Sequence, residues 1–197
     1  MHRTRQIILA SASQRRRDLL RLTGLPFKVD PVICEENMNI RLSPRRLSRV
    51  LSEKKARIAA GKYRDAVIIA ADTFIILRNK IMGKPNTPVR AREMLGALSG
   101  RVHKVITGFT IIDTRTGKCI SRSVETKVYF DKLTMREINA YVRSGEPLDK
   151  AGAYAIQGLG SIFVRRIEGD YFNVIGLPLN ALKSCLKQFG ISSSAHY

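Results

Sequence analysis

The sequence contains no tryptophan and only three cysteines among its 197 residues. Cys34, Cys119 and Cys185 lie far apart and form no Cys-x-x-Cys pair, so neither a zinc motif nor a disulfide framework is indicated. Long hydrophobic runs are also missing. The first apolar run, Ile7 to Ala10, is too short for the core of a signal peptide or for a membrane span. We therefore expect a cytoplasmic protein with no membrane partner.

Acidic residues are scarce. The chain has 16 Asp and Glu against 35 Lys and Arg, which gives a formal net charge of +19. Such a surplus indicates a polyanionic partner, either a nucleic acid or a small phosphorylated ligand, unless the basic residues only solvate the surface. The sequence has no aromatic stacking platform interleaved with basic residues, which argues against nucleic acid. No histidine adjoins a serine or cysteine in a nucleophile motif, and His103, in an apolar strand, is interpreted as structural.

Short apolar runs alternate with segments of helical periodicity, a pattern typical of the α/β class. We expect one compact domain over residues 1–197, with a central cleft. The helix predicted from Ser43 to Gly61 should turn Leu47, Val50, Leu51 and Ile58 inward. The other expected helices cover residues 14–23, 87–98, 134–144 and 178–189. The expected strands cover residues 6–10, 66–71, 102–113, 119–130 and 162–167, and residues 74–77 are expected to continue in extended form.

A basic cluster follows the first strand and contains Ser11, Ser13, Arg15, Arg16 and Arg17. Backbone N–H groups at a helix N-terminus favour an anion, and arginine side chains there match phosphate oxygens. The cluster therefore predicts a phosphate site; the alternative is a solvated basic turn.

Two acidic motifs stand out in this basic chain. Asp72-Thr73 is expected at the end of an apolar strand, where open α/β sheets place ligands. Asp72 could activate water or bind a divalent metal, and Glu35-Glu36 could complete an oxygen-rich Mg²⁺ site. The alternatives are a strand-end cap for Asp72 and plain surface charge for the glutamates.

Further candidates lie along the chain. Lys55 and Lys84 are candidate phosphate ligands, although solvent exposure is the usual state of a lysine. The glycine-rich stretch from Asp149 to Gly160 allows the backbone to approach a flat ligand closely. Gln157 within it carries an amide that can read the edge of a base; a purely structural turn is the alternative.

Taken together, these motifs resemble those of the Maf family of nucleotide pyrophosphatases, and they occur in the family's order over nearly the whole chain. Gln14 departs from the family pattern, which usually has proline at that position. The matching segments are residues 9–16, 53–56, 71–73, 83–85, 94–100, 107–108, 146–154, 156–158, 169–171 and 174–179.

The resemblance implies an elongated α/β fold, related to that of inosine triphosphatases, with a mixed sheet flanked by helices and two lobes around a central cleft. It also implies hydrolysis of a nucleoside triphosphate to the monophosphate and pyrophosphate with Mg²⁺, or with Mn²⁺ or Co²⁺. A homodimer is a further implication.

The resemblance also assigns roles. Asp72 activates water, and Glu36 supports it or binds the metal with it. Lys84 joins the catalytic group, and the residues implied to hold the substrate are Ser11, Arg15, Arg16, Lys55, Thr73 and Gln157. The paired arginines, Asp72-Thr73 and Ile156-Gln157-Gly158 resemble the branch that hydrolyses dTTP and UTP. The alternative function is a nucleic-acid-binding or cell-division regulatory protein without catalysis, which we do not favour.

Overall fold

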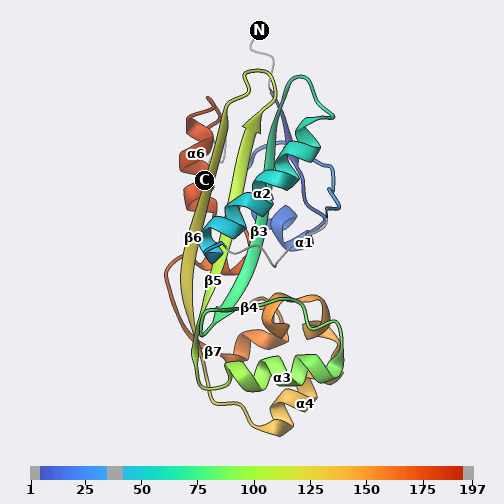
Figure 1. The fold of residues 1–197 in the computed structure, drawn as a ribbon, viewed down its shortest axis with the longest axis vertical. Coiled ribbons are helices and arrows are strands. Elements are labelled where there is room, and N and C mark those ends of the chain that lie inside the picture. The colour runs from blue at the N-terminus through green and yellow to red at the C-terminus, as the bar shows by residue number, and fades with distance from the viewer. Residues whose placement is uncertain (1–4, 35–41, 193–197) are drawn as a thin grey trace. The chain divides into compact units, whose positions relative to one another are not determined.

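The computed structural model describes residues 5–34 and 42–192, and its central element is a seven-stranded mixed sheet (Figure 1). The strand order is β2-β1-β3-β5-β6-β7, with β4 paired to β3. Strand β1 runs parallel to β2 and β3, whereas β4 and β7 run antiparallel to their partners. The mixed α/β sheet expected from the sequence is confirmed. The strands are β1 (Gln6–Leu9), β2 (Lys28–Val29), β3 (Ala66–Leu77), β4 (Lys80–Met82), β5 (Val102–Asp113), β6 (Cys119–Phe130) and β7 (Val164–Glu168).

The helices begin where the sequence carries N-capping residues. Ser13, Thr87 and Thr134 each accept a hydrogen bond from the backbone N–H three residues later, and Thr134 forms a full capping box with Glu137. None of the described helices combines the length and apolar character needed to cross a membrane. The helices are α1 (Gln14–Arg21), α2 (Pro44–Ala60), α3 (Pro88–Leu98), α4 (Met135–Arg143), α5 (Tyr171–Ile175) and α6 (Leu179–Lys187), with 3₁₀ turns η1 (Glu146–Asp149), η2 (Ala151–Ala153) and η3 (Leu159–Phe163).

The chain divides into two compact units. The first contains Met1–Asp72, Thr107–Val124 and Gly176–Tyr197, and the second contains Thr73–Ile106 and Glu125–Ile175. The three long strands β3, β5 and β6 contribute residues to both units. Each unit also has its own buried side chains.

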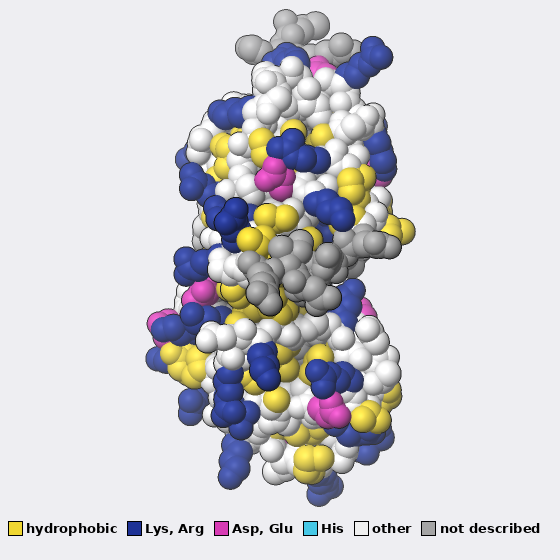
Figure 2. Space-filling view, in the orientation of Figure 1, with side chains coloured by type: hydrophobic (Ala, Val, Ile, Leu, Met, Phe, Trp, Pro, Cys, Tyr) yellow, Lys and Arg dark blue, Asp and Glu magenta, His cyan; other side chains and the backbone are white. Residues whose placement is uncertain are grey.

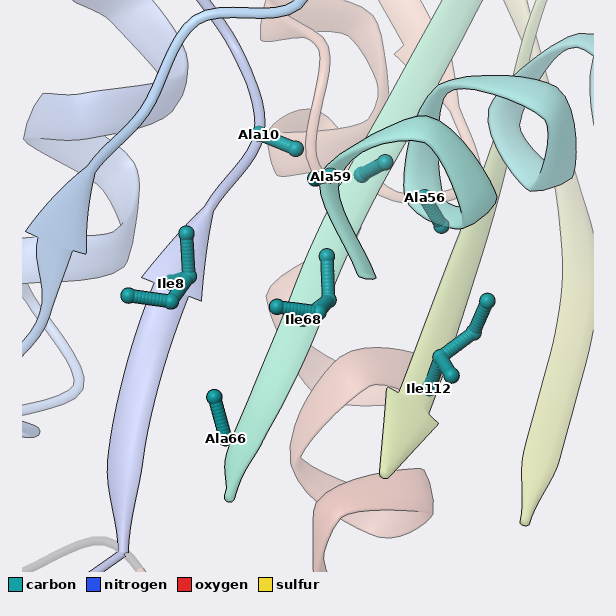
Figure 3. Close-up of a cluster of buried hydrophobic side chains, with 8 residues drawn as sticks. Ile8, Ala10, Ala56, Ala59, Ala66, Ile68 and Ile112 are labelled. Atoms are coloured by element: carbon teal, nitrogen blue, oxygen red, sulfur yellow. The ribbon is translucent and has the colours of Figure 1, made fainter. Parts of the chain in front are cut away.

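In the first unit, helix α2 packs its alanines against the sheet. Ala56 and Ala59 are fully buried and form one cluster with Ile68 of β3 and Ile112 of β5 (Figure 3). Small side chains on both surfaces bring the helix close to the strands, because no long side chain holds them apart. The remaining buried members of this cluster come from β1 and β3 and from the residues next to them: Ile8, Ala10, Ala66 and Ala70.

The inward face of α2 is only partly the one expected from the sequence. Leu47 and Leu51 are buried, but Val50 and Ile58 are 39% and 42% exposed, so their predicted burial is wrong. The buried stripe contains polar and small residues that a search for apolar periodicity passes over: Ser48, Ser52, Lys55, Ala56 and Ala59.

Gly108 in β5 explains why that stripe is small and polar. A Cβ atom at this position would lie 2.3 Å from the carbonyl carbon and oxygen of Ser48, so the α2 backbone rests directly on the strand. Ser52 and Thr110 then meet through their hydroxyl oxygens, 2.8 Å apart and buried. Gly108 therefore sets how closely α2 approaches the sheet.

In the second unit, an aromatic cluster surrounds His103, which is 1% exposed. Its Nε2 lies 2.7 Å from the Tyr154 hydroxyl, and its ring meets Phe130 edge to face. Burial lowers the pKa of His103 to about 4. The histidine is therefore neutral near pH 7 and belongs to the core, as its place in an apolar strand predicts. Strand β7 begins two residues later than expected, because Ile162 belongs to η3 and is 75% exposed.

Substitution of Gly108 by alanine should destabilise the protein, because the added methyl group must displace the α2 backbone. We expect the free energy of unfolding to fall by about 1–3 kcal/mol, measured by urea denaturation. Gly96 in α3 provides the matched control, because a Cβ added there would have no neighbouring atom within 4 Å. Gly96→Ala should raise stability by about 0.5–1 kcal/mol. Equal stability of the Gly108→Ala and wild-type proteins would contradict the direct contact.

The buried neutral His103 should make stability fall in acid. The unfolded chain takes up a proton on this histidine below its ordinary pKa of 6.5, whereas the folded chain does so only near pH 4. The contribution of neutral His103 to the free energy of unfolding is therefore complete above pH 6.5 and is lost as the pH falls from 6.5 towards 4. Between pH 8 and pH 5, wild type should lose about 2 kcal/mol more than His103→Gln, at about 1.4 kcal/mol per unit of pKa difference. Parallel pH profiles of the two proteins would show that folding does not lower the pKa of His103.

Candidate functional site

Asp72 lies within strand β3, so the expected strand end at this residue is wrong. The expectation that Asp72 lies at the ligand-binding edge of the sheet nevertheless has a structural basis. Strand β1 pairs with β3 only as far as Ile69, and Ala10 N donates to Ile69 O at 2.8 Å. Asp72 therefore lies just beyond the carboxyl end of the parallel part of the sheet, at the edge where the turn from β1 to α1 also begins. This is the edge where α/β sheets bind ligands.

Lys55 and Asp72 form a buried ion pair. Lys55 is 8% exposed and Asp72 is 5% exposed, and Lys55 Nζ donates to Asp72 Oδ1. Burying either charge alone would cost several kcal/mol, so each side chain depends on the other. The sequence predicted both residues for the site, and the structure brings them together. The Asp72 carboxyl group is thus held in place by the Lys55 ammonium group.

The turn from β1 to α1 contains the predicted phosphate cluster. Ser11 is buried, and its Oγ accepts hydrogen bonds from Ser13 N at 3.2 Å and from Arg16 Nη1 at 3.3 Å. Arg16 Nε donates to Gly176 O at 2.9 Å, which ties this turn to the segment before α6. Arg16 therefore braces the N-terminal turn of α1, and Arg15 and Arg17 beside it are half-buried. The turn combines helix N–H groups with fixed positive charge, as an anion site requires.

The other predicted residues with described positions belong to the second unit. Thr73 follows Asp72 in β3 and is partly buried, and Lys84 is exposed in the turn after β4. Gly83 O, next to Lys84, accepts a hydrogen bond from Gly152 N at 2.9 Å, and Asn86 N donates to Leu148 O at 3.2 Å. The Lys84 turn is thus fastened to the segment that contains η1 and η2.

Gln157 lies in an exposed loop between η2 and η3 that is held from both sides. Tyr141 of α4 accepts a hydrogen bond from Ala155 N at 3.2 Å and donates to Glu146 Oε1 at 2.8 Å. The Glu146 carboxylate in turn accepts from Leu159 N at 3.0 Å and from Gly160 N at 3.1 Å. These bonds fix the backbone immediately before and after the tripeptide 156–158.

The structure leaves the predicted metal site untested. Glu36, like Glu35, lies outside the described residues, so its predicted place beside Asp72 stays a prediction. Within residues 5–34 and 42–192, no three His, Cys, Asp or Glu side chains are grouped closely enough to hold a metal ion. Asp72 is the predicted metal ligand that the structure places.

Sequence reasoning assigns no role to Glu146, Tyr141 or Gly108, which position site segments. Their partners are backbone atoms far away in the sequence, so no local pattern reveals them. The sequence signal that could have revealed Glu146 and Tyr141 is the pair of glycines that they contact, Gly158 and Gly160. Gly158 has φ +122°, and a Cβ there would lie 2.5 Å from Glu146 Oε2.

The chain is similar to known proteins over nearly its whole length. The family model described as Maf-like protein matches residues 6–189. A dTTP/UTP pyrophosphatase of Alkaliphilus oremlandii (strain OhILAs) is 49% identical over 93% of this chain and 95% of its own. A protein of the same name from Methanosarcina mazei is 47% identical over 95% of this chain and 96% of its own.

A solved structure shares the fold at much lower sequence identity. The Staphylococcus aureus Ham1 protein is 13% identical and matches with a TM-score of 0.51, covering 93% of this chain and 99% of that one. The family match covers nearly all of the described residues, including both segments of the Lys55–Asp72 pair. This chain belongs to the Maf-like protein family.

Proposed function

We propose that this protein hydrolyses dTTP and UTP to the corresponding monophosphates and pyrophosphate. The observation that carries the proposal is the buried Lys55–Asp72 pair at the ligand-binding edge of the sheet, in a chain 49% identical to a dTTP/UTP pyrophosphatase. The reaction consumes one water and breaks the bond between the α-phosphorus and the oxygen that bridges to the β-phosphorus. We place the reaction in the cytoplasm, since all three cysteines are free thiols.

Asp72 is the group that we assign to the attacking water. A carboxylate fixed by Lys55 can orient a water molecule and accept its proton as the oxygen bonds to the α-phosphorus. Lys55 holds the carboxylate in position and offsets its charge near an anionic substrate. Negative charge that develops on the pyrophosphate must be stabilised by cations that are already in place.

The substrate-binding roles follow the family pattern. We assign Ser11, Arg15 and Arg16 to the triphosphate, and Lys84 to phosphate binding as well. Thr73 contacts the substrate next to Asp72. Gln157 reads the pyrimidine edge, because its amide offers both a donor and an acceptor.

A divalent metal fits the donor chemistry of this site. Mg²⁺ at phosphate sites is usually bound by one or two carboxylates together with substrate phosphates, and Asp72 supplies a fixed hard oxygen donor. Glu36 is the second proposed ligand, and Mn²⁺ or Co²⁺ would suit the same oxygen donors. When bound, the metal would neutralise charge on the phosphates.

The proposed reaction is tested by incubating the protein with Mg²⁺ and a panel of nucleoside triphosphates and measuring pyrophosphate and monophosphate release. Wild type should prefer dTTP and UTP, and Asp72→Asn should lower turnover at least about 100-fold, the lower range of the effect of a general base. Asp65→Asn, an exposed substitution just before β3, is the matched control and should keep full activity.

Two outcomes would overturn parts of the proposal. Preference for a 7-methylated guanine nucleotide would keep the enzyme and reject the pyrimidine assignment. No hydrolysis of any nucleotide by the folded protein would favour the nucleic-acid-binding alternative suggested by the charge of +19. Lysine and arginine side chains are spread over the face seen in Figure 2.

The buried ion pair should show strong energetic coupling. Lys55→Met should lower the free energy of unfolding by about 3 kcal/mol, because it leaves the Asp72 carboxylate without its buried cation. Adding Asp72→Asn should recover most of that loss, since the double variant buries no charge at this position. Urea denaturation of the two single variants and the double variant measures the coupling; additive effects would mean that the two charges do not depend on each other.

A further inference from the structure

The loop that carries Gln157 has a backbone conformation that the chain does not adopt readily by itself. Gly158 has φ +122° and ψ −157°, a region open almost only to glycine. Gln157, Gly158 and Leu159 are exposed, whereas Ala155 and Gly160 on either side are buried. An exposed tip of this kind keeps one conformation only if its ends are fixed, because solvent offers its backbone equally good hydrogen bonds.

Tyr141 and Glu146 fix both ends through one connected network. The Tyr141 hydroxyl binds the backbone N–H before the tip, and the Glu146 carboxylate binds two backbone N–H groups after it. The hydroxyl also donates to the carboxylate, so movement at one end is transmitted to the other. The Tyr141 hydroxyl also packs directly against the loop backbone, since a Cβ at Gly160 would lie 2.6 Å from the hydroxyl oxygen.

The charge of Glu146 strengthens this network. Burial raises the pKa of its carboxyl group, but hydrogen bonds from Tyr141, Leu159 N and Gly160 N outweigh burial and bring the pKa below its ordinary value. The carboxylate is therefore ionised near pH 7, and hydrogen bonds to an ionised acceptor are stronger than those to a neutral one. Nothing in the proposed reaction needs a carboxylate at this position, so its evident use is to hold the loop.

We propose that Glu146, acting with Tyr141, is a positioning residue for base recognition, which holds the 155–160 loop so that the Gln157 amide meets the pyrimidine in one orientation. This inference rests on the proposed function. A side chain that is already oriented loses less conformational entropy on binding, so its hydrogen bonds contribute more to affinity and selectivity. Glu146 would thus act on substrate choice without contacting substrate.

The test compares UTP with CTP, which differ at the pyrimidine edge and have the same triphosphate. In Glu146→Gln, one acceptor oxygen becomes an amide nitrogen that cannot accept from the loop. We expect KM for UTP to rise about 10-fold with kcat nearly unchanged, and the ratio of kcat/KM for UTP over CTP to fall about 10-fold, equivalent to one lost hydrogen bond. Tyr141→Phe, which removes only the hydroxyl, should change the same ratio in the same direction.

Glu137→Gln is the matched control. Glu137 also accepts hydrogen bonds from a backbone N–H and a hydroxyl, at the start of the same helix α4, but both belong to Thr134. Its loss should lower stability and leave the UTP/CTP ratio unchanged. A fall in that ratio in Glu137→Gln would show that general destabilisation produces the effect, and would overturn the proposal.

The decisive comparison adds Glu146→Gln to Gln157→Ala. Because Glu146 is proposed to act through Gln157, the double variant should discriminate UTP from CTP no worse than Gln157→Ala alone. Additive losses, or an unchanged ratio in Glu146→Gln, would overturn the proposal. Absence of UTP hydrolysis by wild type would instead reject the proposed function, so the two failures are distinguishable.

Discussion

The buried pair of Lys55 and Asp72 constrains the first unit more than any other interaction that we describe. Two opposite charges with little solvent exposure are tolerable only in direct contact, which requires α2 to cross β3 at a fixed height and a fixed rotation. Gly108 determines the distance between helix and sheet, because it has no side chain and the α2 backbone can contact β5 directly. The small residues of the α2 stripe set the rotation, because only they fit against the strands at that distance. In this orientation of the helix Lys55 is buried, whereas the apolar side chains of Val50 and Ile58 are exposed.

The second unit positions its loops by a different method. Apart from Thr73 in β3, its predicted site residues lie in loops and turns, and hydrogen bonds to backbone atoms hold these segments. Glu146 and Tyr141 hold the loop around Gln157, and backbone hydrogen bonds from Gly152 and to Leu148 hold the turn around Lys84. Such loops can change in sequence and length while the sheet stays constant. Gln157, the residue proposed to read the base, lies in such a loop, whereas Asp72, the residue proposed to activate water, lies in a strand.

The sequence predicts those parts of the fold whose signals are local. The capping box at Thr134 and the hairpin from Val102 to Phe130 both lie where expected, because caps and alternation act over a few residues. The inward face of α2 escapes prediction because its centre contains serines, which lie against β5 near Gly108, and a lysine, which pairs with Asp72. Asp72 resembles a strand end because a carboxylate inside a buried strand needs a partner, and its partner lies 17 residues earlier in the chain. The role of Glu146 has no local signal, since it binds backbone atoms 13 and 14 residues later.

The large positive charge follows from composition, 35 Lys and Arg against 16 Asp and Glu, and several of the few acidic residues have structural roles. Asp72 and Asp113 are buried and bind Lys55 and Arg5, Glu146 holds a loop, and Glu137 caps a helix. Lysine and arginine side chains are spread over the face that Figure 2 shows. The resulting field attracts polyanions of every kind and weakens with salt, so it speeds encounter without choosing among ligands. Choice must therefore come from groups fixed in the fold, and a neutral amide such as that of Gln157 can discriminate only when the backbone that carries it is held still.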